Sequence, residues 1–116
     1  GPQDEVKTMA LEFEKRRDYM YQKINSIRYL NCQKPQGAFY VYVNISELMN
    51  RELSGVKINS SIDLALVLLE KANVAVIPGA AFGTDSYIRL SYATSMDTIV
   101  KGLDILEDFL DKNLKK

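Results

Sequence analysis

Hydrophobic side chains recur at steps of three and four residues along three stretches of the chain, the spacing of one face of an α-helix. The first stretch runs from Asp4 to Ile27, the second follows Ser60, and the third follows Thr94. The first contains the longest stripe, whose members are Val6, Met9, Ala10, Phe13, Met20, Ile24 and Ile27. The pattern therefore predicts three amphipathic helices.

Polar and small residues mark where these helices begin and end. Asp4 can cap the first helix, and Ser60 with Asp63 has the spacing of a capping box for the second. Asn73 suits a left-handed stop after it. Gly102 costs the third helix about 1 kcal/mol relative to alanine, so we expect close packing at that position.

Short β-rich runs lie between the helices, at residues 28–32, 38–44, 74–77 and 87–93. Turn residues separate the first two runs, and Pro78-Gly79 ends the third. Residues 45–59 look irregular, with a short helical piece at 45–50. The order α-β-β-α-β-β-α predicts an α+β fold with a largely antiparallel sheet of about four short strands. We expect helices on one face of that sheet and a partner domain on the other.

Arg89 is the charged residue that most needs an explanation, because it lies inside an apolar strand. Side chains alternate across a strand, so Ile88 and Leu90 share the core face while Arg89 and Ser91 share the other. A guanidinium is costly to hold away from water without an anionic partner. Its partner is either a carboxylate of the same protein or a ligand such as a substrate carboxylate or phosphate.

Composition narrows the classes of function. The 116 residues are a single-domain length, and the 15 basic and 15 acidic residues balance, which argues against a nucleic-acid partner. No apolar run approaches the roughly 20 residues of a membrane span, and the N-terminus is not signal-like, so we expect a cytoplasmic protein. The chain has one cysteine, Cys32, and no histidine, which disfavours a self-sufficient hydrolase or zinc enzyme. We interpret Gly1-Pro2 as an expression-tag scar and residues 3–116 as the domain.

Four sequence pieces, in order, resemble a known family: EFEKRRD (12–18), PQGAFY (35–40), VAVIPGAAFG (74–83) and YIRLSYA (87–93). They are similar to the C-terminal small domain of fold-type I pyridoxal-phosphate aminotransferases, the aspartate aminotransferase group. The resemblance covers nearly the whole chain after its first residues. It implies that Arg89 binds the α-carboxylate of an amino-acid substrate, and that Gly37 and Phe39 lie near the active-site cleft.

The resemblance also implies what lies outside this chain. The lysine, aspartate and tyrosine that hold pyridoxal phosphate belong to the family's large domain. Ser54-Gly55-Val56-Lys57 resembles the start of the lysine motif, but the family's downstream glycine and arginine are missing, so Lys57 is better read as a loop lysine. The resemblance implies amino-acid and 2-oxo-acid substrates, pyridoxal phosphate and a homodimer for the parent enzyme, and a fragment that is inactive alone.

Two alternatives stay open at the level of sequence. Arg17 lies on the apolar stripe of the first helix, either as a side chain reaching water at the stripe's edge or as a partner for the large domain. The chain as a whole is either an aminotransferase domain or a stand-alone, non-catalytic interaction module. In the second case its apolar and tyrosine-rich surfaces would bind another protein.

Overall fold

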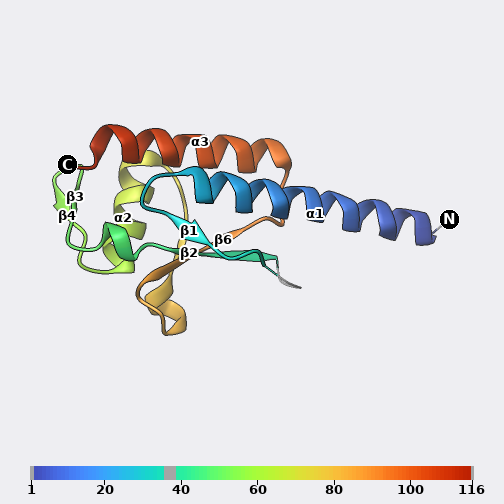
Figure 1. Ribbon diagram of the computed structural model, residues 1–116, viewed down its shortest axis with the longest axis horizontal. Coiled ribbons are helices and arrows are strands. Elements are labelled where there is room, and N and C mark those ends of the chain that lie inside the picture. Colours follow the sequence, from blue (N-terminus) through green and yellow to red (C-terminus); the bar gives the residue numbers. More distant parts are fainter. Residues whose placement is uncertain (1, 36–38, 116) are drawn as a thin grey trace.

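The computed structural model describes residues 2–35 and 39–115 and shows helices over a four-stranded sheet, with a separate two-stranded hairpin (Figure 1). The helices within these residues are α1 (Pro2–Ser26), α2 (Ser61–Ala72) and α3 (Met96–Asn113), with 3₁₀ turns η1 (Ser46–Leu48) and η2 (Gly79–Phe82). The strands are β1 (Asn31–Cys32), β2 (Tyr40–Asn44), β3 (Glu52–Leu53), β4 (Val56–Lys57), β5 (Ile77–Pro78) and β6 (Tyr87–Ser91).

The described part of the chain forms a four-stranded sheet in the order β1-β2-β6-β5, with every neighbouring pair antiparallel. The two long strands form its centre, where Tyr42 lies opposite Arg89 and Val43 opposite Ile88. In Figure 1, α1 and α3 lie side by side on one face of this sheet, and η2 lies on the other side. The predicted α+β fold, with helices on one face, is confirmed.

The core lies between this sheet and the helices. Val41, Val43 and Ile88 point to the helix layer and are almost fully buried, as their alternation with polar residues predicts. They join one hydrophobic cluster with residues from each helix: Met20, Ile24, Leu64, Leu68, Leu103 and Leu106. Burial of aliphatic side chains on one face fixes which strand residues point the opposite way, and Arg89 is one of them.

The start of α1 extends beyond this core, as Figure 1 shows. Val6 and Met9, the first members of the predicted stripe, are 68% and 62% exposed, whereas Met20 and Ile24 in the same stripe are buried. The stripe is therefore continuous in sequence, but only its second half is covered by the described part of this chain.

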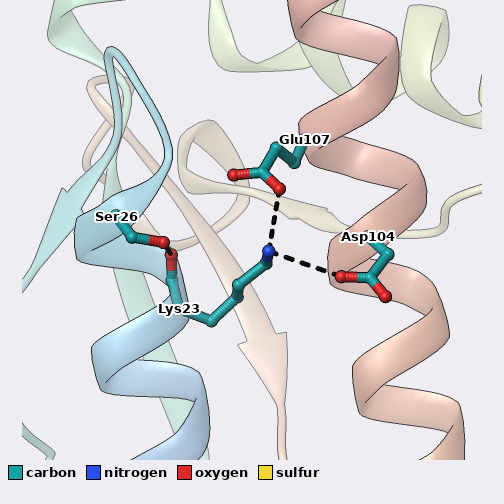
Figure 2. Close-up of polar contacts among 4 residues, drawn as sticks. All are labelled: Lys23, Ser26, Asp104 and Glu107. Carbon is teal, nitrogen blue, oxygen red and sulfur yellow. Dashed lines mark hydrogen bonds and ion pairs between the residues drawn. The ribbon is translucent and has the colours of Figure 1, made fainter.

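An ion-pair cluster joins α1 to α3 at the edge of the core. The Lys23 ammonium lies 2.8 Å from a Glu107 carboxylate oxygen and 3.4 Å from Asp104, as drawn in Figure 2. The hydrogen bond to Glu107 raises the pKa of Lys23. Ser26 belongs to the same turn of α1, where its hydroxyl donates to the Lys23 carbonyl. The cluster links the two helices at this point, outside the hydrophobic contacts of the core.

The predicted ends of α2 are confirmed. Ser60 Oγ accepts a hydrogen bond from the Asp63 N–H at 3.1 Å, and Asn73 adopts the left-handed conformation with φ 56°. The Asp63 carboxylate accepts from the Asn59 N–H, one residue before the partner that a standard capping box would use.

Three predicted segments differ from the structure. The first strand begins at Asn31, because Tyr29 has a positive φ of 74° and the Leu30 N–H bonds back to Ile27 in a turn. The third strand is limited to Ile77–Pro78. Val74, at its predicted start, donates its N–H to the Leu68 carbonyl at the end of α2 instead of to a neighbouring strand. Residues 45–59, which looked irregular, contain the hairpin β3–β4 around Ser54-Gly55 as well as η1.

The expected close packing at Gly102 is wrong. A Cβ built on this glycine would meet nothing within 4 Å outside its own helix turn. Gly102 instead lines a mostly apolar groove of about 350 Å³ between α3 and β6. In the described residues, no neighbouring side chain packs into the space beside Gly102.

Candidate functional site

Arg89 lies in the middle of β6 and points away from the helix layer. Its cross-strand neighbours are Tyr42 on β2 and Ile77 on β5, so it has a strand on both sides. The residues before and after it, Ile88 and Leu90, point into or against the core. This placement follows from strand alternation, and it fixes the base of the arginine side chain on rigid backbone.

The guanidinium lies among aromatic rings. Its Cζ is 4.2 Å from the centroid of the Tyr40 ring and 5.4 Å from that of Phe82. Nε is buried and has no hydrogen-bond partner among the described residues. No carboxylate of the described residues forms an ion pair with Arg89, so the alternative of an internal acidic partner has no support in residues 2–35 and 39–115.

Phe82 reaches Arg89 from the turn η2, and the shape of this turn depends on a glycine. A Cβ on Gly79 would collide with the carbonyl oxygens of Thr84 and Tyr87, so no side chain fits there. The turn ends at Gly83, whose φ of 88° favours glycine. The Phe82 ring also meets Tyr42 edge-on, with centroids 5.4 Å apart.

A buried serine attaches η2 to the start of α2. Ser61, fully buried, donates from its N–H and from Oγ to Asp85 Oδ1, at 2.9 and 2.6 Å. Ser61 Oγ also accepts from the Ala80 N–H at 3.0 Å. The hydrogen bonds from Ser61 lower the pKa of Asp85 and hold its carboxylate ionised. The residues before and after Phe82 are therefore both tied to one helix end.

The arrangement suits recognition of a carboxylate. A permanently charged guanidinium lies on an open sheet face, and its described contacts are with ring faces rather than with acids. Such a group can form two parallel hydrogen bonds with a planar anion. Within the described residues, no group of three or more acidic, cysteine or histidine side chains is placed to hold a metal ion. No helix of the described residues is both long and apolar enough to cross a membrane.

Two other residues were predicted to lie near the site, Gly37 and Phe39. Gly37 is outside the described residues. Phe39 is 50% exposed and lies beside the helix layer, with its ring centroid 4.8 Å from Phe13 and 6.0 Å from Tyr92. Among the described contacts of Phe39, none is with Arg89. Their proposed place near the cleft stays a prediction.

Lys57 lies on the exposed strand β4, whose hairpin partner β3 pairs through Leu53 with Leu114, directly after α3. The described contacts of Arg89 include no lysine. The residues around Arg89 therefore do not by themselves fit the aldehyde of pyridoxal phosphate, which needs a lysine partner.

Arg17 has a partner in its own helix. Its Nε and Nη2 both lie 3.2 Å from Asp18 Oδ1, and Lys34 lies 3.1 Å from the same oxygen. The pKa of Asp18 is lowered, first by Lys34 and then by Arg17. Arg17 is thus a half-buried, paired side chain at the edge of the stripe.

Comparison with known proteins places this geometry in a family. Residues 1–106 match the model of the class I and II aminotransferases. The chain belongs to this aminotransferase family. It is 43% identical, over 96% of its length, to a probable aspartate/prephenate aminotransferase of Rickettsia conorii, and 37% identical over 92% to an aspartate aminotransferase of Streptomyces avermitilis. Its fold superposes on the crystal structure of the Rhizobium meliloti aspartate aminotransferase with a TM-score of 0.92, at 37% identity over 99% of this chain.

These aminotransferases are much longer than this chain. The chain spans 28% of the Rickettsia conorii protein, 26% of the Streptomyces avermitilis protein and 29% of the Rhizobium meliloti structure. It therefore corresponds to a little over a quarter of such an aminotransferase.

Proposed function

We propose that this chain is the C-terminal small domain of an aminotransferase that transfers an amino group between an amino acid and a 2-oxo acid, with Arg89 binding the substrate α-carboxylate. The observation that carries the proposal is the Arg89 guanidinium on the sheet face away from the helices, which has no anionic partner in residues 2–35 and 39–115. A buried or half-buried arginine usually has an anionic partner, and Arg89 has none among the described residues. A substrate carboxylate would supply it.

The role of Arg89 in this proposal is to orient the substrate. A bidentate pair fixes both the position and the rotation of the carboxylate, and so determines which bond of the α-carbon is aligned for cleavage. A charge-assisted hydrogen-bonded pair is worth on the order of 1.5–3 kcal/mol, which corresponds to about a ten- to hundredfold change in kcat/KM.

The rest of the enzyme would supply the chemistry. Pyridoxal phosphate, held by the large domain of the same polypeptide, stabilises negative charge that develops at the α-carbon. The uncovered start of α1 and the sheet face that carries Arg89 are the surfaces that such a domain would cover. We therefore expect the 116-residue chain alone to be inactive with added pyridoxal phosphate. Transaminase activity of the 116-residue chain alone, if it disappeared on Lys57→Ala, would contradict the proposal that the catalytic lysine belongs to the large domain.

The role of Arg89 can be tested in the full-length enzyme. Arg89→Lys keeps the charge but loses the fork of donors, so KM for the amino acid should rise and kcat should fall, while the absorbance of the bound cofactor stays unchanged. Arg51→Lys is the matched control, because Arg51 also stacks on a tyrosine, at 4.4 Å from the Tyr29 ring, but is bonded to the Glu47 carbonyl. Wild-type kinetics in Arg89→Lys would refute the assigned role.

A further inference from the structure

The aromatic neighbours of Arg89 raise the question of what holds its guanidinium in one orientation. A long arginine side chain has several rotatable bonds, and a bidentate grip requires its plane to be fixed. Hydrogen bonds from Nε to nearby acceptors commonly provide this. Here Nε is buried, and no described residue accepts a hydrogen bond from it. A hydrogen bond from Nε to these residues therefore does not hold the plane of the guanidinium.

In the part of the chain that the structure describes, two aromatic rings contact the guanidinium and can hold its plane. Tyr40 lies diagonally across the β2–β6 pair from Arg89, since Tyr42 is directly opposite it, and its ring centroid is 4.2 Å from Cζ. Phe82 is 5.4 Å away and comes from a different element, η2. Cations are attracted to ring faces, and the attraction grows where water is displaced.

We propose that Tyr40 and Phe82 are positioning residues whose ring faces hold the plane of the Arg89 guanidinium, so that its terminal nitrogens are presented to a carboxylate. The inference rests on the proposed role of Arg89 as the substrate-binding residue. Tyr40 comes from rigid β2, and Phe82 is held by Gly79, whose missing side chain leaves room for the Thr84 carbonyl. Ser61 adds a second constraint through its bonds to Ala80 and Asp85, on either side of Phe82.

The proposal assigns the positioning role to the ring of Tyr40 and none to its hydroxyl. Stacking requires the ring face only, and no described hydrogen bond involves the Tyr40 hydroxyl. Tyr40→Phe should therefore behave as wild type, whereas Tyr40→Leu should not. Tyr87→Leu is the matched control, because Tyr87 is a half-buried tyrosine of β6 on the same face, with no described contact to the guanidinium.

The test measures discrimination between an amino acid and its α-carboxamide in the full-length enzyme. The carboxamide keeps the reacting carbon but cannot pair with Arg89 as an anion. The ratio of the two kcat/KM values should fall about 5- to 30-fold in Tyr40→Leu, the size expected for loss of one desolvated cation–ring contact. It should stay within about twofold of wild type in Tyr40→Phe and Tyr87→Leu, since neither removes that contact.

A spectroscopic measurement checks the geometry directly. Protons lying over a ring face resonate upfield, so the Arg89 side-chain signals of the 116-residue chain should be shifted upfield. The shift should persist in Tyr40→Phe and become much smaller in Tyr40→Leu, where the Phe82 ring remains. An unchanged shift in Tyr40→Leu would overturn the stacking.

The outcomes distinguish this proposal from the one on which it rests. If Tyr40→Leu lowers kcat/KM equally for acid and carboxamide, the ring has only a structural role and the positioning proposal fails. If Arg89→Leu loses discrimination while Tyr40→Leu keeps it, Arg89 is the carboxylate ligand but the rings do not position it. If Arg89→Leu itself keeps discrimination, the proposed function fails, and the positioning role fails with it.

Discussion

Replacement of Ser61 by alanine should loosen the turn that carries Phe82. The substitution removes a fully buried hydroxyl that bonds both to Asp85 and to the Ala80 N–H, at 2.6 and 3.0 Å. Alanine fits the first turn of α2, so the backbone of the helix is not disturbed. The Ala80 N–H loses its acceptor, which should lower the free energy of unfolding by about 1–3 kcal/mol. Asp85 keeps its hydrogen bond from the N–H of residue 61 but loses the bond from the hydroxyl.

Urea denaturation of the 116-residue chain measures this change in the free energy of unfolding. In a thermal melt, each kcal/mol should lower Tm by roughly 3–6 °C for a chain of this length. Ser26→Ala is the matched control, since Ser26 is exposed and its hydroxyl bonds only within its own helix turn, to the Lys23 carbonyl. It should change the free energy of unfolding by less than about 0.5 kcal/mol.

The pH dependence of the Ser61→Ala effect gives a sharper test. Ser61 lowers the pKa of Asp85 below its ordinary 3.8, so the ionised carboxylate stabilises the fold above that value. This stabilisation is lost as the pH falls through the lowered pKa. The difference in unfolding free energy between wild type and Ser61→Ala should therefore narrow in acid. Two results would contradict the assigned role of the Ser61 hydroxyl. One is a loss of unfolding free energy in Ser61→Ala at neutral pH that is as small as in Ser26→Ala. The other is a loss that does not change with pH.

Two further substitutions test the helix layer. Gly102→Ala should raise the free energy of unfolding by about 0.5–1 kcal/mol, because its Cβ meets no neighbour and alanine favours the helix; destabilisation in a thermal melt would reveal a contact that the fold does not show. Lys23→Met keeps the aliphatic stem but removes the ion pairs with Asp104 and Glu107, and should cost about 0.5–1 kcal/mol. That loss should shrink in high salt, and a salt-independent loss would point to packing instead.

Periodicity along the chain was sufficient to predict the layers of the fold. The stripe of α1 and the alternation in β2 and β6 depend on which side chains are buried, and burial imposes its period directly on the sequence. The same alternation put Arg89 on the face away from the helices, where the structure has it.

Short elements and contacts between distant loops were not predictable in this way. The strands of the β3–β4 hairpin have two residues each, too few to show a period, although the turn residue Gly55 with its φ of 82° is a recognisable signal. Ser61 and Asp85 are 24 residues apart, and nothing in their spacing indicates that they meet. Phe82 reaches Arg89 because a 3₁₀ turn bends back over the sheet, and that bend depends on packing at Gly79.

Both outer strands of the sheet are very short. β1 and β5 have two residues each, and β5 ends in Pro78, which has no N–H to offer. A foreign strand that paired with β1 or β5 would find only two residues there, too few for a stable ladder. These two outer strands should therefore be poor templates for edge-to-edge polymerisation of the 116-residue chain into fibrils.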